Sequence, residues 1–259
     1  MYIDTHAHLN YENKYGDERA LMKNIRDAGV DEVIAVGWDL ASSRLAKAVA
    51  TRYEGVYFAA GIHPSDTAKA AESDYDGVEA LLSDEKAVAV GEIGLDYHYD
   101  GTNEPAQKAA FVRQMEIAHA HGLPFVIHSR DAAEDTLSLL KQNRGKLLYG
   151  AVMHCFSGSA ETAKELLKLG LYISFAGPVT FKNAKKLAET AKIVPSDRIL
   201  AETDCPYLAP EPYRGTLNTP ANVALVTKKL AELRGESVEK TAADIKRNAH
   251  ALFYKMNRG

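Results

Sequence analysis

The sequence has 259 residues, of which 46% are hydrophobic and 25% are charged, with a net charge of −4 at pH 7. Such a composition is typical of a globular protein with a large core, and the lack of a strongly basic segment argues against a nucleic-acid-binding tail. Two cysteines are too few for a disulfide framework, and the sequence has neither a secretory signal nor an apolar run of about 18 residues. We therefore expect a cytoplasmic protein.

Short apolar runs alternate with amphipathic stretches along the first half of the chain. Strands are expected at residues 4–8, 33–36, 56–60 and 87–92. Of the helices between them, one is expected to be capped by Asp17 and ended by Gly29, one to be capped by Ser42 or Ser43, and one to lie around residues 78–82. A loop that contains Asp96 should follow the fourth strand.

The same alternation continues to the end of the chain. Strands are expected at residues 124–128, 151–154, 171–175 and 198–204, and helices at 105–121, after Asp131, after Ser159, at 183–191, after Thr219 and at 238–254. Eight strand–helix units in 259 residues give about 32 residues per unit. The pattern predicts one (β/α)8 TIM barrel over residues 1–259, with an extra C-terminal helix, rather than two domains.

Ionisable side chains collect where these strands end. They are His6, His8, His63, Glu92, His128, His154 and Asp204. Alternation along the first strand places two of these imidazoles on one face, about 7 Å apart. Active sites lie at the carboxyl ends of the strands in this fold. The remaining histidines, at positions 98, 119, 121 and 250, fall in helices or loops and are expected to be structural or solvated.

Four imidazoles and two carboxylates exceed the three protein ligands of a catalytic zinc ion. They suit two divalent cations, such as zinc, magnesium or manganese, that share one carboxylate. Glu92 is the expected bridge because it lies between the two histidine groups in the sequence. One ion would be held by His6, His8, Glu92 and Asp204, and the other by Glu92, His128 and His154. The alternative is a set of core histidines, which would leave several buried polar groups in need of partners.

Catalytic and substrate-binding roles follow from these positions. Metal coordination can bring the pKa of water toward about 7, and Asp204 is expected to bind a metal with one oxygen and to take the water proton with the other. Glu92, the expected bridge, is the second residue expected to be catalytic. Arg130 is expected to clamp a phosphate, with a surface salt bridge as the alternative. His63 is expected to touch the phosphate or the leaving group, with a structural cap on its loop as the alternative.

Further residues carry open alternatives. Glu202 orients a metal ligand or fills the barrel, and Asp96 supports a ligand or caps its loop. Cys155 and Cys205 are expected to be small apolar filler turned away from the barrel axis. Tyrosines 97, 99, 207 and 213 stack on bases or cover the barrel rim, and the cations Lys182, Lys185, Lys186 and Arg214 either attract a polyanion or form a solvated face.

Six ordered motifs resemble the signatures of the TatD family of metal-dependent deoxyribonucleases, a branch of the amidohydrolase-like barrels. They are residues 4–8 (DTHAH), 61–64 (GIHP), 91–97 (GEIGLDY), 126–130 (VIHSR), 154–158 (HCFSG) and 202–210 (ETDCPYLAP). The resemblance extends from His6 to Asn248 and Ala249. It implies a TIM barrel, one or two divalent metals at the positions above, and hydrolysis of DNA, often as a 3′-to-5′ exonuclease. Related amidohydrolases carry a carboxylated lysine where this chain has Glu92, which favours the TatD branch.

Single-stranded DNA or frayed ends are therefore the expected substrate, with no membrane and no obligatory protein partner. The main alternative is a metal-dependent hydrolase of an ester or amide, such as a cyclic amide or an aminoacyl ester, because both chemistries need an activated water. A metal-storing barrel without enzymatic activity is the second alternative.

Overall fold

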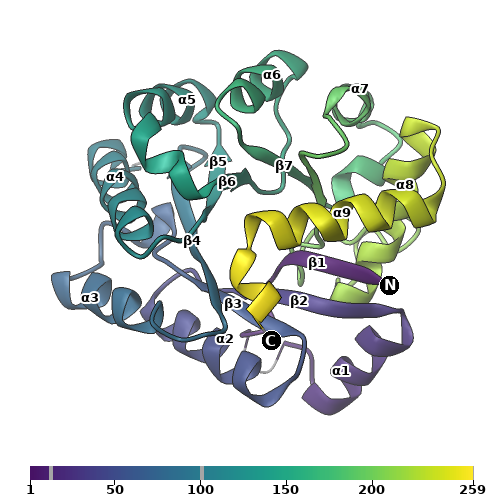
Figure 1. Ribbon diagram of the computed structural model, residues 1–259, viewed down its shortest axis with the longest axis horizontal. Helices are drawn as coiled ribbons and strands as arrows, with labels where there is room; N and C mark the ends of the chain where they lie inside the picture. Colours follow the sequence, from purple (N-terminus) through teal and green to yellow (C-terminus); the bar gives the residue numbers. More distant parts are fainter. Residues whose placement is uncertain (12–13, 100–101, 259) are drawn as a thin grey trace.

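A ring of parallel strands forms the centre of the molecule (Figure 1). The computed structural model describes residues 1–11, 14–99 and 102–258, and in these residues eight strands pair in chain order. They are β1 (Tyr2–Ala7), β2 (Val30–Val36), β3 (Val56–Ala60), β4 (Ala87–Asp96), β5 (Phe125–Arg130), β6 (Ala151–Met153), β7 (Tyr172–Phe175) and β8 (Ile199–Ala201). Next to β8, a parallel bridge between Ala7 and Cys205 joins the last strand region to β1. The predicted (β/α)8 barrel is confirmed.

The helices surround the strands (Figure 1). They are α1 (Glu18–Asp27), α2 (Leu40–Arg52), α3 (Glu72–Leu81), α4 (Glu104–Ala120), α5 (Ala133–Gln142), α6 (Ala160–Lys168), α7 (Lys185–Ile193), α8 (Val223–Arg234) and α9 (Val238–Leu252). The last of these is the predicted extra helix, and it packs against β8 and β1. Among the described helices, none has the length and apolar character needed to cross a membrane.

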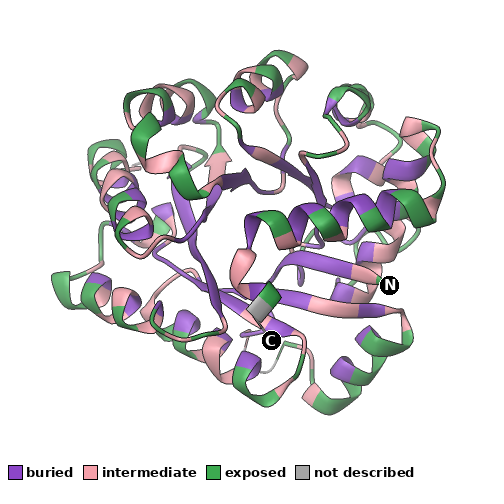
Figure 2. Ribbon diagram, viewed as in Figure 1, coloured by how far each residue is buried: buried purple, intermediate pink, exposed green. Residues whose placement is uncertain are grey.

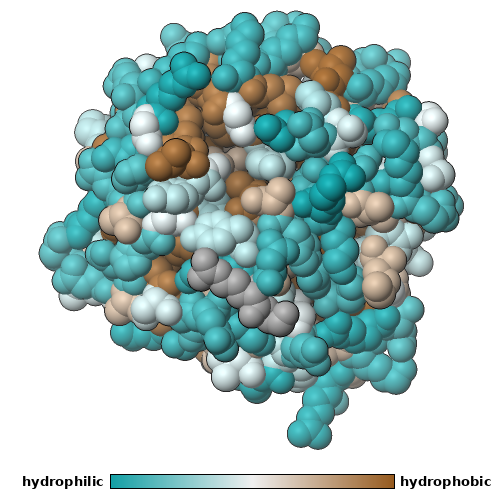
Figure 3. Space-filling model, viewed as in Figure 1, coloured by the Kyte–Doolittle hydropathy of each residue, from teal (hydrophilic) through white to brown (hydrophobic). Residues whose placement is uncertain are grey.

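Burial follows the expected amphipathic pattern. The strands and the inward faces of the helices are buried, while the outward helix faces are exposed (Figure 2). In the space-filling view, hydrophilic side chains dominate this face and apolar ones show mainly in recesses between them (Figure 3). The apolar core therefore lies both inside the barrel and between the barrel and its helices, which fixes the strand ends that carry the ionisable residues.

Two of the predicted helix caps are confirmed and two are wrong. The Asp17 carboxylate accepts the backbone N–H groups of the first turn of α1, and Ser159 caps α6. Helix α2 begins earlier than predicted: Asp39 is its cap, and the Ser42 hydroxyl oxygen accepts the Asp39 N–H group in return. Asp131 has a positive φ of 53° and does not cap α5, which follows Ala132.

Strand lengths also differ from the prediction. Strand β4 continues to Asp96, because it pairs with β5 as far as Asp96 and Arg130, so the carboxylate predicted in a loop stands at a strand end. Gly94 permits this pairing: its φ is +140°, and a Cβ there would lie 2.0 Å from the carbonyl oxygen of His128. Strand β8 ends at Ala201, before the residues that were predicted to complete it.

Candidate metal centre

The six predicted ligands come together at the carboxyl ends of the strands. Five strand regions supply them: β1 (His6 and His8), β4 (Glu92), β5 (His128), the residue after β6 (His154) and the segment after β8 (Asp204). Two of the six, those from β5 and from the β8 segment, are partly exposed, and the others are buried. Residues up to 198 positions apart in the chain thus share one cluster.

One group of donors is spaced for an ion rather than for hydrogen bonds. The His6 Nε2 atom lies 3.6 Å from Oε2 of Glu92 and 3.8 Å from Oδ1 of Asp204, and His8 Nε2 lies 3.9 and 3.4 Å from the same two oxygens. Donors of a tetrahedral ion at about 2.1 Å stand about 3.4 Å from one another. In the described part of the chain, neither ring nitrogen of His6 has a hydrogen-bond partner although both are buried. The residues therefore fit a divalent cation.

A second group meets the other oxygen of Glu92. Its Oε1 lies 2.8 Å from Nδ1 of His128 and 2.6 Å from Nε2 of His154, and these two nitrogens are 3.3 Å apart. The two contacts of Oε1 have hydrogen-bond lengths, unlike the wider spacing of the first group. Glu92 nevertheless offers one oxygen to each group, as a carboxylate shared by two ions would.

The distances between donor atoms also define sets of three residues that could hold an ion. Within the described ranges, three sets have ligand atoms within 4.8 Å of one another: His6 with His8 and Glu92, His6 with His154 and Glu202, and His63 with Glu92 and His128. Asp204 is in none of these sets, although its Oδ1 lies near the rings of His6 and His8. Glu92 belongs to two of the three, which supports its central position.

Hydrogen bonds to the second ring nitrogen orient two of the histidines, His8 and His128. The His8 Nδ1–H group donates to the carbonyl of Val36 at 2.9 Å, which leaves Nε2 free to face the carboxylates. The Nε2 atom of His128 lies 3.1 Å from Oδ2 of the buried Asp96. Such bonds fix the tautomer and the direction of a metal-binding ring. Asp96 therefore contacts a proposed ligand through Oδ2, and its Oδ1 atom accepts the backbone N–H group of His98 at 3.0 Å, so the contacts of both predicted alternatives are present.

Glu202 orients the ring of His154 by a hydrogen bond. Its Oε1 atom accepts from Nδ1 of His154 at 3.2 Å and from the backbone N–H group of Cys155 at 2.7 Å. The side chain is 1% exposed, so it also fills the barrel, but its hydrogen bonds make it an orienting residue.

Replacing Asp96 with asparagine should weaken metal binding without removing a ligand. The amide cannot accept the His128 proton as strongly as a carboxylate, so we expect a 10- to 100-fold loss of metal affinity, the usual range for such partners. Competition with a fluorescent chelator measures this loss. An unchanged affinity in Asp96→Asn would contradict the orienting role.

Electrostatics in the cluster keep its central carboxylates ionised. Burial alone would raise the pKa of Glu92, but His154 and His128 lower it well below its ordinary value. Burial is likewise outweighed at Asp204, where the bond from His8 lowers the pKa. Burial and the neighbouring His154 lower the pKa of His6. Ionised carboxylates and a neutral imidazole are the forms that bind cations. At His8, His128 and His154 burial is outweighed by the neighbouring carboxylates, which raise the pKa, so a cation would have to displace protons from these rings.

His63 caps its loop, which was the alternative predicted for it, while its contact with the phosphate or the leaving group stays a prediction. Its Nδ1 atom accepts the backbone N–H group of Ser65 at 3.2 Å, so the ring caps the turn after β3. The other nitrogen, Nε2, lies 3.8 Å from Oε1 of Glu92, and the ring packs edge-on against His128. Burial lowers the pKa of His63 to about 4, which keeps the ring neutral at the edge of the cluster.

Arg130 stands at the exposed end of β5, and its guanidinium has no carboxylate partner among the described residues. The guanidinium carbon lies 5.6 Å from the centre of the Tyr99 ring. A surface salt bridge was the alternative for this residue, and the described contacts do not include one.

An open cavity of about 770 Å³ lies over the cluster. The predicted residues His63, Arg130, Tyr99 and Tyr207 line it, together with Tyr11, Trp38, Phe156 and Leu208, which the sequence analysis did not single out. These four come from loops, where no periodic pattern marks a residue as inward-facing. Of the other tyrosines, Tyr97 donates its hydroxyl to Asp135, and Tyr213 is exposed outside the cavity lining.

The prediction for Cys155 was wrong in one respect. It lines the cavity beside Asp204 instead of turning away, because a φ of 41° breaks the strand alternation on which the prediction relied. Burial and the Asp204 carboxylate raise the pKa of its thiol well above the ordinary value, so it stays protonated. Cys205 is fully buried, as predicted.

The remaining predicted cations and histidines lie outside the cavity. The lysines Lys182, Lys185 and Lys186 are exposed at the start of α7, and the Arg214 guanidinium stacks on Phe181 at 4.3 Å. Three of the non-site histidines pair with carboxylates, at the positions His98 (with Asp131), His121 (with Glu79) and His250 (with Glu32). Their structural or solvated roles agree with the prediction.

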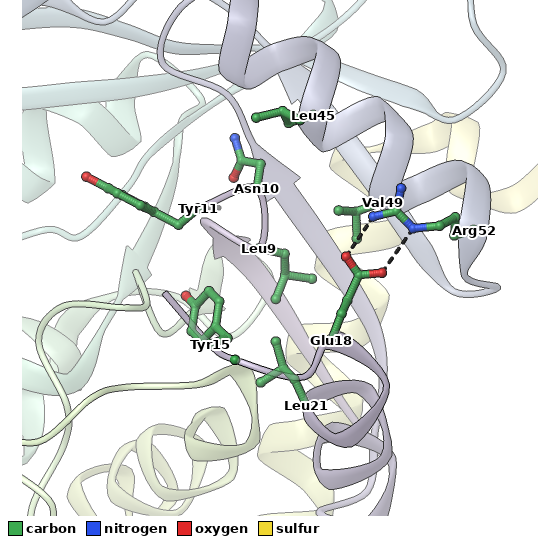
Figure 4. A pocket seen from close by; sticks show the side chains of 10 residues that line it. Leu9, Asn10, Tyr11, Tyr15, Glu18, Leu21, Leu45, Val49 and Arg52 are labelled. Carbon is green, nitrogen blue, oxygen red and sulfur yellow. Dashed lines mark hydrogen bonds and ion pairs between the residues drawn. The ribbon is translucent and has the colours of Figure 1, made fainter. Parts of the chain in front are cut away.

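A smaller hollow of about 260 Å³ lies between α1 and α2 (Figure 4). Leu9, Leu21 and Val49 point into it, and the ion pair of Glu18 with Arg52 closes one side. Tyr11 points away from this hollow and belongs to the lining of both cavities. Asn10 fixes this loop, because its amide donates to the carbonyls of Val36 and Ser42.

Comparisons with known proteins agree on one family. The family described as TatD related DNase matches residues 3–254. The uncharacterized metal-dependent hydrolase YabD of Bacillus subtilis is 43% identical over 98% of this chain and 99% of its own. A Cronobacter sakazakii protein named 3'-5' ssDNA/RNA exonuclease TatD is 35% identical over 92% of each chain. The crystal structure of YJJV, a TatD homolog of Escherichia coli K12, has a TM-score of 0.92 at 31% identity, with 98% of each chain covered.

Proposed function

The chain belongs to the TatD-related DNase family of metal-dependent hydrolases, and from this premise we propose that it cleaves phosphodiester bonds of DNA, as a 3′-to-5′ exonuclease. The observation that carries the proposal is the shared carboxylate: Glu92 directs one oxygen to each of two donor groups beneath an open cavity. Two-cation centres of this kind stabilise both the attacking and the leaving oxygen of a phosphoryl displacement.

Two divalent cations, when bound, would lower the pKa of a water and neutralise charge on the phosphate oxygens. His6, His8, Glu92 and Asp204 would hold one, and Glu92, His128 and His154 the other. The name of the Cronobacter relative includes single-stranded DNA and RNA, which favours a nucleic acid as the substrate.

Two side chains at the cavity are proposed to take part in proton transfer, Asp204 and His63. Asp204 directs Oδ1 toward the His8 and His6 rings, and its partial exposure leaves the carboxylate in contact with the cavity, where it accepts the proton of the attacking water. His63 stands on the opposite side of Glu92 and is neutral, so its Nε2–H group can donate a hydrogen bond to the leaving oxygen.

Arg130 is proposed as the phosphate clamp. Its planar guanidinium borders the cavity one strand position beyond Ser129 and can bind two phosphate oxygens at once. The Arg130→Ala change should raise KM for DNA about 10-fold or more and leave the metal content unchanged. Arg130→Lys should restore only part of the affinity, because an ammonium group lacks the two-pronged geometry. An unchanged KM in both variants would contradict the clamp.

Hydrolysis of an ester or amide remains the second candidate, because a metal-activated water serves both chemistries. The decisive assay compares metal-loaded protein on end-labelled single-stranded DNA with the same protein on esters and lactams. Chelator-sensitive loss of 3′-terminal nucleotides supports the proposal. Intact DNA at excess enzyme and metal, together with turnover of an amide, would contradict it.

A metal-storing barrel predicts bound metal and no hydrolysis. The cavity of about 770 Å³ above the donors favours an enzyme, since a storage site has no need of space for a substrate. Chelator-sensitive hydrolysis of bis-nitrophenyl phosphate distinguishes the two, and its absence at saturating metal would favour storage.

A further inference from the structure

Three aromatic residues form a continuous surface on one side of the cavity, and we call them the aromatic wall: Tyr11, Trp38 and Tyr207. The ring centres of Tyr11 and Trp38 are 4.9 Å apart, and those of Tyr11 and Tyr207 are 6.2 Å apart. The two tyrosine hydroxyls are hydrogen-bonded at 2.8 Å. All three rings line the cavity over the metal cluster.

The aromatic wall begins at the cluster itself. The Trp38 ring packs edge-on against the His8 ring, with the centres 5.4 Å apart. His8 is one of the proposed ligands, so a group bound beside the cations has Trp38 as its neighbour. Arg130 ends β5 and Tyr99 follows β4, and these two strands lie across the barrel from β8 and β1, so Arg130 and Tyr99 line the cavity from another side.

Hydrogen bonds fix the backbone at Trp38 and Tyr207, while the side chains of both residues are only partly buried. The Trp38 N–H group donates to Ser42 Oγ, and the Trp38 carbonyl accepts the His63 N–H group at 2.8 Å. The carbonyl of Tyr207 accepts from the Asn218 amide at 2.7 Å. Tyr207 is nevertheless 48% exposed, and Trp38 is half-buried. Rings that pack against one another and stay partly exposed can bind a flat partner with little further loss of side-chain entropy.

The chemistry of the wall selects its ligand. Burial and the bond to Tyr11 raise the pKa of Tyr207 to about 12, so the Tyr207 hydroxyl carries no charge at neutral pH. A neutral aromatic face next to a centre for phosphate suits a nucleobase, since every base has a π-face and stacks regardless of sequence. A base in a duplex is already stacked and paired, whereas an unpaired terminal base is free to bind.

We propose that the aromatic wall stacks against the nucleobase next to the scissile phosphate and so sets a preference for unpaired DNA ends. This proposal rests on the proposed function, because it places the phosphate at the metal cluster. Trp38 supplies the contact nearest to the cations, and Tyr11 and Tyr207 extend it toward the cavity mouth.

The first test compares substrates with and without the base. The wild-type protein and the Trp38→Ala variant are assayed on a single-stranded oligonucleotide and on the same oligonucleotide with its last two bases removed. We expect Trp38→Ala to lower kcat/KM on the ordinary oligonucleotide about 10- to 100-fold, the loss of one base stack. On the base-free end, the two proteins should differ by less than about twofold, because the stack is already absent.

Two further variants serve as controls. Trp38→Phe keeps an aromatic face and should retain most of the activity. Tyr213→Ala removes an exposed tyrosine from the same loop as Tyr207 but outside the cavity lining, and it should not change the ratio between the two substrates. Activity of Trp38→Ala on the base-free end also shows that the variant is folded and that its metal centre is intact.

The second test measures the contact between Trp38 and the base by fluorescence, because Trp38 is the single tryptophan of the sequence. Titration of the metal-loaded protein with an oligonucleotide that ends in phosphorothioate linkages should quench the tryptophan fluorescence, and a base-free end should not. Equal slowing of both substrates by Trp38→Ala, or quenching that does not depend on the bases, would overturn the aromatic wall while leaving the nuclease activity in place. A wild-type protein that cleaves neither oligonucleotide would instead contradict the proposed function.

Discussion

Replacement of Glu92 with alanine is expected to lower both the metal content and the activity of the protein. Glu92 lies 2.6 and 2.8 Å from two of the histidine nitrogens and 3.6 Å from a third, so its removal takes a ligand from both donor groups at once. We expect fewer than one tightly bound ion per chain and a fall in kcat/KM of about 10³-fold or more, which is about 4 kcal/mol. Elemental analysis and the DNA assay measure the two effects.

The matched control is Glu134→Ala, an exposed glutamate at the start of α5 for which no ion pair is found in the described residues. It should keep full metal content and activity. His128→Ala should lose one ion, because it removes a ligand from the second group only. Unchanged metal content in both Glu92→Ala and His128→Ala would remove the two-ion proposal.

The Asp204→Asn change is expected to separate the role of Asp204 in proton transfer from its role as a metal ligand. The amide keeps the size of the side chain, but it cannot accept the water proton, and it binds a cation more weakly through one neutral oxygen. We expect kcat to fall about 10²- to 10⁴-fold, the usual contribution of a general base, with a smaller change in KM. Measurement of kcat and KM on the oligonucleotide checks this separation.

Metal content must be measured in the same variant. The first donor group retains His6, His8 and Glu92, so at high metal concentration both sites should fill. If kcat recovers to within about threefold of the wild-type value in excess metal, Asp204 acts only as a ligand and its role as the base is wrong.

The barrel was predictable because alternating strands and helices of regular length leave few other folds. The alternating pattern locates each strand and helix but does not determine the residue at which it begins or ends. The errors of the prediction are at these boundaries. Strand β4 continues to Asp96 because Gly94 allows its backbone to approach β5. Helix α2 starts at Leu40 with Asp39 as its cap, and Ser42, predicted to be the cap, lies in the first turn and completes a capping box with Asp39. Such choices depend on neighbouring strands and helices that the local sequence does not show.

The metal cluster was predictable for a different reason. Strand-end histidines and carboxylates converge in any barrel of this topology, so their position in the chain determines their position in space. Cys155 is an exception to this rule, because its backbone leaves the strand conformation at a φ of 41°. The aromatic wall could not be predicted in this way, because Tyr11 and Trp38 lie in loops, whose backbone is held by hydrogen bonds of Asn10, Ser42 and His63.

Anomalous diffraction from crystals of the metal-loaded protein tests the central claim most directly. Two peaks about 3.5 to 4 Å apart are expected, one among His6, His8, Glu92 and Asp204 and the other among Glu92, His128 and His154. A single peak at saturating metal, or peaks away from Glu92, would contradict the shared-carboxylate centre on which the proposed chemistry depends.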